Sequence, residues 1–130
     1  MTENLVPSSK SDVAAAELAV ARGWPAVEPV LPKLLEWLQD YNWPVARVLA
    51  PFVAQIGDPV APYLRPIFDS DDLIWKRWII NVVLADAPLS VVEQFRSELE
   101  HFVNDPTPGE AQEDLPEVAK PVLDRLSLES

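Results

Sequence analysis

Cysteine is absent from this sequence of 130 residues, and its absence removes several kinds of site at once. A chain without thiols has no disulfide, no thiolate zinc site, no iron–sulfur cluster and no cysteine nucleophile. The absence does not by itself indicate a reducing compartment. At this length about two-thirds of the unfolded surface can be buried, so the chain can fold without such covalent support.

Glycine and histidine are almost as scarce. The three glycines, Gly23, Gly57 and Gly109, lie too far apart to form a glycine-rich phosphate-binding loop. His101 is the only histidine, so it cannot build a multi-histidine metal site, and the chain lacks the sharp nucleophile turn that a catalytic triad requires. We expect His101 to be a solvated surface residue and the protein not to be an enzyme.

The acidic segment Asp69, Asp71 and Asp72 resembles a metal site in composition only. It lacks the glycine-turned calcium loop with its terminal glutamate. Asp71 or Ser70 is instead expected to cap a helix, with Asp72 in the first turn, where the helix dipole favours a carboxylate. We therefore expect no metal and no cofactor.

Positive charge is limited. The sequence contains ten lysines and arginines and 21 acidic residues, which gives a net charge of −11. This balance argues against nucleic acid as a partner, since binding to the phosphate backbone depends on clustered cations. Residues 24–89 carry 8 acidic and 5 basic side chains, whereas residues 90–130 carry 10 and 3. The C-terminal third is therefore expected to be an acidic face that steers a basic partner.

Long hydrophobic runs are also missing. No stretch approaches the roughly 18 apolar residues of a membrane span, and residues 1–10 contain no apolar signal-peptide core. We expect a cytoplasmic protein with no membrane partner. Because 48% of the residues are hydrophobic, a substantial core and a single domain over residues 1–130 are expected.

Proline is abundant, and its 14 residues lie among leucines, valines and tryptophans. Proline is tolerated in the first turn of a helix, so most of these residues mark helix starts, whereas Pro51 is expected to kink a helix or to force a late restart. Ser11 and Asn42 are expected N-caps, and Ser90 with Glu93 forms an expected capping box. These signals predict about seven helices, at roughly residues 11–22, 26–39, 43–56, 59–68, 72–84, 91–104 and 116–127.

The middle of the chain repeats at an offset of 29 residues. Apolar positions recur as apolar, turn-forming side chains as turn-forming, and cations as cations. A repeat of this length is typical of paired helices stacked into a solenoid, and it predicts an all-α fold whose usual role is binding. The first copy contains Leu35, Leu38, Asp40, Asn42, Val45, Arg47 and Val53, and the second contains Leu64, Ile67, Asp69, Asp71, Ile74, Lys76 and Val82.

The same segment resembles a known repeat pattern. Residues 34–40, Leu-Leu-Glu-Trp-Leu-Gln-Asp, followed by the Val-Ala-Arg of residues 45–47 and the Ile-Gly of residues 56–57, resemble the HEAT-repeat consensus. In that consensus an aspartate ends the first helix and a valine–arginine pair begins the second. The resemblance implies a right-handed, HEAT-like α–α superhelix.

A narrower resemblance rests on tryptophan. Residues 37–45, WLQDYNWPV, and residues 72–78, DLIWKRW, resemble a bacterial family known as domain of unknown function 5071, over about residues 10–105. This resemblance implies no established activity. Beyond the repeats, residues 106–115 are expected to form an acidic loop and residues 116–127 a helix that seals the last repeat.

The first candidate site is the loop Asp40-Tyr41-Asn42-Trp43-Pro44. Tryptophan and tyrosine are the usual anchors of protein interfaces, so this loop is a candidate binding ridge. The alternative is architectural, with Asp40 and Asn42 capping helix ends and Trp43 packing as a hydrophobic staple.

The second candidate is the segment 75–78, Trp-Lys-Arg-Trp. One hypothesis is a cation–aromatic cluster that grips an anionic group of a partner. The alternative is that Lys76 or Arg77 bridges to Asp40 or Asp69 of the neighbouring repeat. Helical spacing places both tryptophans on one face.

These features favour a non-enzymatic, protein-binding scaffold module. A specialised form of this hypothesis, by analogy, is an immunity-type inhibitor of a basic toxin. The first alternative is a small-molecule or peptide pocket between the helices that carry Trp43 and Trp78, and the second is structural self-association. The predicted binding residues are Trp37, Asp40, Tyr41, Asn42, Trp43, Trp75, Lys76, Arg77 and Trp78.

Overall fold

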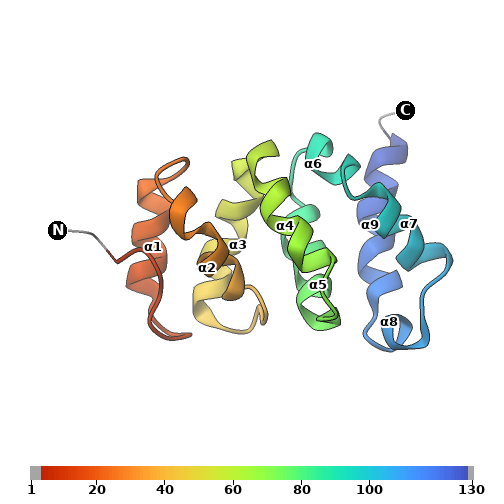
Figure 1. Ribbon diagram of the computed structural model, residues 1–130, viewed down its shortest axis with the longest axis horizontal. Helices are drawn as coiled ribbons and strands as arrows, with labels where there is room; N and C mark the ends of the chain where they lie inside the picture. Colours follow the sequence, from red (N-terminus) through yellow and green to blue (C-terminus); the bar gives the residue numbers. More distant parts are fainter. Residues whose placement is uncertain (1–3, 129–130) are drawn as a thin grey trace.

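The computed structural model describes residues 4–128, and every regular element in this range is a helix (Figure 1). The all-α expectation is therefore confirmed. Two 3-10 turns, η1 (Glu28–Val30) and η2 (Asp58–Val60), precede α2 and α4, and a π-helical turn, η3 (Ile80–Leu84), continues α5. The α-helices are α1 (Val13–Arg22), α2 (Leu31–Glu36), α3 (Pro44–Ile56), α4 (Ala61–Phe68), α5 (Leu73–Ile79), α6 (Leu89–Glu93), α7 (Arg96–Asn104), α8 (Pro108–Gln112) and α9 (Leu115–Leu128).

The helices form two layers that follow chain order along the long axis of the molecule (Figure 1). One layer contains α1, α3, α5 with η3, and α9, because α1 packs on α3 and η3 packs on both α3 and α9. The other contains α2, α4, α6 and α7, with α6 against η2 and α7 along α9. The hydrophobic core lies between these layers and binds them into one unit.

The expected count of about seven helices is wrong, because residues 4–128 contain nine α-helices. One additional helix arises where the expected helix over 91–104 breaks into α6 and α7 at Phe95. The Phe95 ring is buried and packs on Phe68, with ring centroids 4.8 Å apart. The other is α8, which occupies part of the segment 106–115 expected to be a loop.

Several helix caps lie one residue from their expected positions. Asp12, and not Ser11, caps α1 with its side chain. Asp72, and not Asp71 or Ser70, caps α5. In each case two or three neighbouring residues have capping side chains, and the packed face of the helix decides which of them is used.

The expected capping box at Ser90 and Glu93 is also wrong. The Ser90 hydroxyl donates to a carboxylate oxygen of Asp58 and so joins α6 to η2. A complete capping box is present instead at α8, between Thr107 and Glu110. The helix α3 continues through Pro51, so the late restart expected there does not occur.

The core shows that the second helices of the repeat are related by an offset of 30 residues. Val45 is fully buried, but its expected counterpart Ile74 is 49% exposed, and Lys76, the expected counterpart of exposed Arg47, is buried. The helix α5 therefore has one more residue before its packed face than α3. At the offset of 30, buried Leu49, Ala50, Val53 and Ala54 of α3 correspond to buried Ile79, Ile80, Val83 and Leu84 of α5 and η3.

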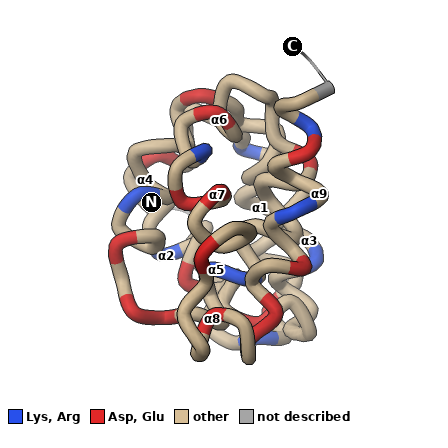
Figure 2. The backbone as a smooth tube through the Cα atoms, turned by 90° about the vertical axis from the view of Figure 1, so that its right-hand side faces the viewer, with Lys and Arg blue, Asp and Glu red and all other residues tan. Residues whose placement is uncertain are grey.

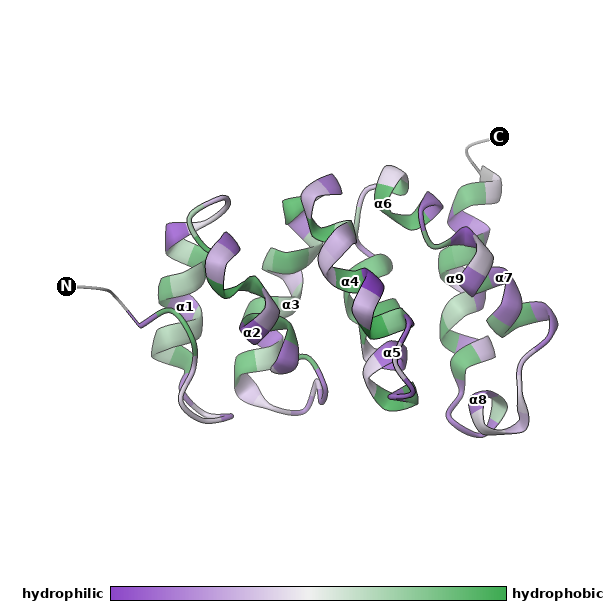
Figure 3. Cartoon of the chain, in the orientation of Figure 1, coloured by the Kyte–Doolittle hydropathy of each residue, from purple (hydrophilic) through white to green (hydrophobic). Residues whose placement is uncertain are grey.

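Hydropathy follows the same division of faces. Figure 3 shows hydrophobic and hydrophilic residues on different sides of α3, α4 and α7, as amphipathic packing requires. Among residues 4–128, no helix is both long enough and apolar enough to cross a membrane.

Candidate binding surface

The predicted loop residues separate into two aromatic contacts. The ring of Trp37 at the end of α2 meets Trp43 at the start of α3 edge-on, with centroids 5.6 Å apart and planes at 73°. Tyr41 turns the other way and lies against Trp78 of α5, with centroids 5.8 Å apart and planes at 35°. The loop therefore connects the first repeat to the second through Tyr41.

Two arginines extend the Tyr41–Trp78 contact. The guanidinium carbon of Arg47 lies 5.7 Å from the Tyr41 ring centroid, and that of Arg77 lies 4.5 Å from the Trp78 ring centroid. Both distances are within the range of cation–π attraction. We call this set, in the contact order Arg47, Tyr41, Trp78 and Arg77, the arginine–aromatic ladder.

Neither arginine of the ladder has an acidic partner in the described part of the chain. Arg47 donates from Nε to the carbonyl oxygen of Tyr41 at 3.3 Å. Arg77 forms no hydrogen bond or ion pair with residues 4–128, and its Nε is buried without an acceptor. The expectation that Arg77 bridges to Asp40 or Asp69 is therefore wrong.

Other arginines are engaged. Arg65 pairs with Glu98, and Arg96 pairs with Glu93 at 2.8 Å. Arg125 donates to two backbone carbonyl oxygens, at 2.6 and 2.8 Å. The ladder thus differs from these sites because the Arg77 guanidinium has neither a carboxylate nor a carbonyl partner among residues 4–128.

The polar loop residues do not act as helix caps. Asp40 accepts a hydrogen bond from the Asn42 N–H at 2.8 Å, which closes a local turn. Asn42 is exposed, and the helix α3 begins after Trp43 with no side-chain cap. Asp40 and Asn42 therefore shape the loop that presents Tyr41.

Trp75 and Trp78 have different neighbours, although helical spacing predicts that the two share a face. Its indole N–H donates to the carbonyl oxygen of Leu35 in α2 at 3.1 Å. Trp75 lines an apolar hollow of about 230 Å³ between α2 and α4, together with Tyr63 and three prolines. The Tyr63 hydroxyl donates to Glu28 at 2.8 Å, and this hydrogen bond raises the pKa of Tyr63 above its usual value.

The pocket expected between the helices of Trp43 and Trp78 stays a prediction, because the two residues have different neighbours. Trp43 and Trp37 line a hollow of about 260 Å³ beside α2. Trp78 lines neither this hollow nor the one at Trp75 and contacts Tyr41 instead. The tryptophans thus belong to three different environments.

Lys76 faces away from the ladder and is only 8% exposed. It lines a hollow of about 340 Å³ with Glu98, His101 and Glu110, yet it has no ion pair within residues 4–128. Both carboxylates already have partners, Arg65 for Glu98 and His101 for Glu110. The expectation that Lys76 bridges an aspartate of the next repeat is wrong.

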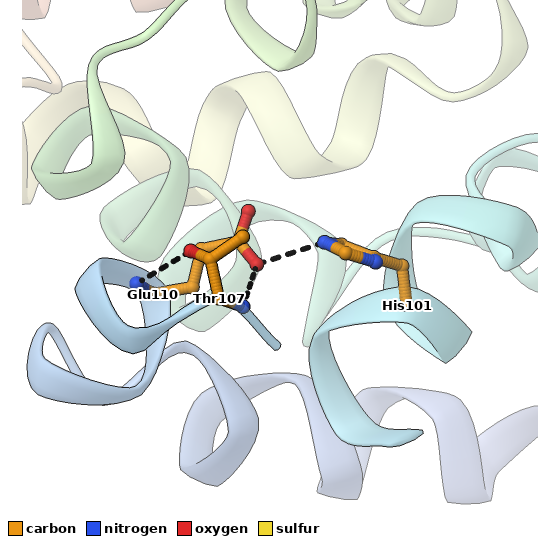
Figure 4. Close-up of polar contacts among 3 residues, drawn as sticks. All are labelled: His101, Thr107 and Glu110. Carbon is orange, nitrogen blue, oxygen red and sulfur yellow. Dashed lines mark hydrogen bonds and ion pairs between the residues drawn. The ribbon is translucent and has the colours of Figure 1, made fainter. Parts of the chain in front are cut away.

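His101 belongs to a polar network that the sequence analysis missed (Figure 4). Its Nε2 lies 2.8 Å from Oε1 of Glu110, which also accepts the Thr107 N–H at 2.9 Å. The Glu110 N–H donates to the Thr107 hydroxyl at 3.2 Å. The Thr-x-x-Glu spacing is the signal that could have identified this box.

Acidic residues are spread over the C-terminal end of the molecule. Figure 2 looks onto this end and shows Asp and Glu positions along α6, α7 and α8, with few Lys and Arg positions between them. The acidic residues between positions 90 and 128 therefore lie on α6, α7, α8 and α9 or in the loops between them, and not on the helices that carry the ladder.

Two further findings concern relatives of the chain. No curated protein matches the sequence. One protein family does match, over residues 5–123, which is nearly the whole chain. The chain belongs to this family, which is described as Domain of unknown function (DUF5071).

Proposed function

We propose that this protein is a non-enzymatic protein-binding module and that the arginine–aromatic ladder is its contact surface. The observation that carries the proposal is the ladder itself, in which two half-buried rings are flanked by two arginines without acidic partners. Tyrosine, tryptophan and arginine are the residues most enriched among energetic anchors of protein interfaces.

The architecture supports the same proposal. Two layers of helices stacked in chain order, with the core between them, are compatible with a HEAT-like α–α superhelix. Such solenoids present extended surfaces on which partners dock. We propose that the protein forms this superhelix, that it comes from a bacterium and that it acts in the cytoplasm.

The acidic surface suggests the overall charge of the partner. A net charge of −11 attracts a basic protein and speeds its association, most strongly at low salt. An inhibitor that masks a basic protein is one form of such a module. The same charge disfavours nucleic acid, so we propose a protein as the partner.

Affinity capture with matched variants tests the proposal. The wild-type protein, the double variant Arg77→Ala/Trp78→Ala and the control Arg96→Ala would be used to capture proteins from lysate of the source organism at low and moderate salt. Arg96→Ala also removes one cation but lies outside the ladder, paired with Glu93. We expect one basic protein to bind wild type and control, to elute as salt rises, and to be lost with the double variant. Equal capture by all three proteins would contradict the proposal.

A second candidate function is supported by the hollow at Trp75. Its lining is apolar, its volume is about 230 Å³, and an indole lies in its wall. We propose it as an alternative site for a small molecule or an apolar peptide side chain. A saturable change in tryptophan fluorescence that is lost in Trp75→Phe would favour this candidate, whereas an unchanged signal across a metabolite library would argue against it.

A further inference from the structure

We propose that the ladder seats a carboxylate group of the partner, held by the guanidinium of Arg77 and flanked by the rings of Trp78 and Tyr41. The proposal rests on the proposed function and names the chemistry of the group that the contact surface recognises. The carboxylate has two possible sources in a protein partner, an acidic side chain and the chain terminus.

The free donors of Arg77 are the first argument. A buried donor without an acceptor is unfavourable, and the Nε of Arg77 is in this state. A guanidinium presents a planar fork of N–H groups that matches the two oxygens of a carboxylate. An incoming carboxylate that draws this fork outward would supply the acceptor that Arg77 lacks among residues 4–128.

The stacking of the ladder is the second argument. Arg77 lies over the face of Trp78 at 4.5 Å, so the ring supports the flat side of the guanidinium. The Trp78 ring is held in turn by Tyr41. At the far end, Arg47 is fixed by its hydrogen bond to the Tyr41 carbonyl and adds a second positive charge. The two rings are thus in place before a ligand arrives, and the Arg77 guanidinium is the group that must move outward.

Local charge is the third argument. The chain has 21 acidic residues, yet none in the described range pairs with Arg47 or Arg77. The acids nearest in sequence, Asp40 to Arg47 and Asp72 to Arg77, accept backbone N–H groups of Asn42 and Trp75 instead. A partner that is basic overall, and so attracted by the acidic surface, can still present one carboxylate to this local cationic site.

The test is a titration of the 130-residue protein, labelled with nitrogen-15 and followed by NMR at the Arg77 Nε–H and the Trp78 indole N–H. N-acetylphenylalanine represents a terminal carboxylate, and the α-methylamide of N-acetylglutamate represents an acidic side chain. Each is compared with its uncharged amide counterpart. We expect saturable shifts with a carboxylate probe, with a dissociation constant on the order of millimolar, and none with the amides.

Variants identify the residue responsible. Arg77→Lys keeps the charge but removes the planar fork, so it is expected to weaken carboxylate binding by about tenfold. Arg96→Ala should leave the binding unchanged. The comparison of acid and amide probes on the wild-type protein needs no variant, so it stands even if Arg77→Lys does not fold.

The outcomes separate this inference from the proposed function. Amides that bind as well as acids, or no probe binding at all, would overturn the carboxylate site. If capture still depends on the ladder in that case, protein binding stands without it. If carboxylates bind at the ladder but capture is the same for all variants, the site stands and the proposed function falls.

Discussion

Replacing Glu110 with alanine is expected to destabilise the protein by about 2 kcal/mol. Glu110 is only 9% exposed, and one oxygen, Oε1, accepts from both the Thr107 N–H and His101. Alanine removes this acceptor and leaves the N–H of the N-cap residue Thr107 without a partner. Hydrogen bonds to a charged group contribute about 1.5–3 kcal/mol to stability. Because His101 is exposed, its side chain can form a hydrogen bond with water after Glu110 is removed, which reduces the loss. The measurement is urea unfolding followed by circular dichroism, where the midpoint should fall with little change in slope.

Two partner variants sharpen this prediction. Glu110→Gln keeps the acceptor oxygen but not the charge, so it should lose about half as much stability as Glu110→Ala. Thr107→Ala removes the other half of the capping box and should cost about 1 kcal/mol. The two hydrogen bonds of the box support each other, so their losses should not add. The double variant Thr107→Ala/Glu110→Ala should lose less stability than the sum of the two single variants, by at least about 0.5 kcal/mol. Additive effects, or a loss below about 0.5 kcal/mol for Glu110→Ala, would refute the reasoning.

Three other substitutions test the packing and charge of the fold. Phe95→Ala should lower the free energy of unfolding by about 3–5 kcal/mol in urea, because a fully buried ring is removed. Lys76→Met should leave the thermal midpoint equal or raise it, since the buried stem is kept and an unpaired ammonium is removed; a clear fall would indicate a partner for Lys76. Hydrogen bonds from the Ser8 and Ala15 N–H groups lower the pKa of Asp12 in the folded state. Its ionised form therefore stabilises the protein above the ordinary carboxyl range, and this contribution is lost as pH falls, so the melting-point deficit of Asp12→Asn should be largest near neutral pH and shrink in acid.

Helix positions were largely predictable because proline and glycine leave few local choices. Gly57 ends α3 at φ 87°, a conformation that favours glycine, and Pro59 opens η2 immediately afterwards. The break between α6 and α7 could not be predicted, because it depends on the packing of Phe95 against Phe68, a residue 27 positions earlier. Caps were misplaced by one residue for a related reason. Neighbouring Ser and Asp residues are equally good caps, and only the packed face of the helix chooses between them.

The candidate site shows the same limit. Tyr41, Arg77 and Trp78 could be nominated from residue type, because aromatic and arginine residues are typical anchors. The contact between Tyr41 and Trp78 could not be predicted, because the direction in which the Tyr41 side chain points is set by the tertiary arrangement of the two repeats. The offset of 29 paired Arg47 with Lys76. Because that offset is one residue too short, it concealed the equivalence of Arg47 and Arg77.

With the observed offset of 30, Arg47 and Arg77 occupy equivalent positions in α3 and α5. Their aromatic neighbours are not equivalent, because the position matching Tyr41 holds Asp71, and the position matching Trp78 holds Val48. Each repeat therefore supplies one arginine and one ring, and each ring meets the other only at the boundary between repeats. It follows that the two repeats build a single ladder, not one each. A carboxylate-bearing partner that uses this site should therefore bind with a stoichiometry of one per molecule.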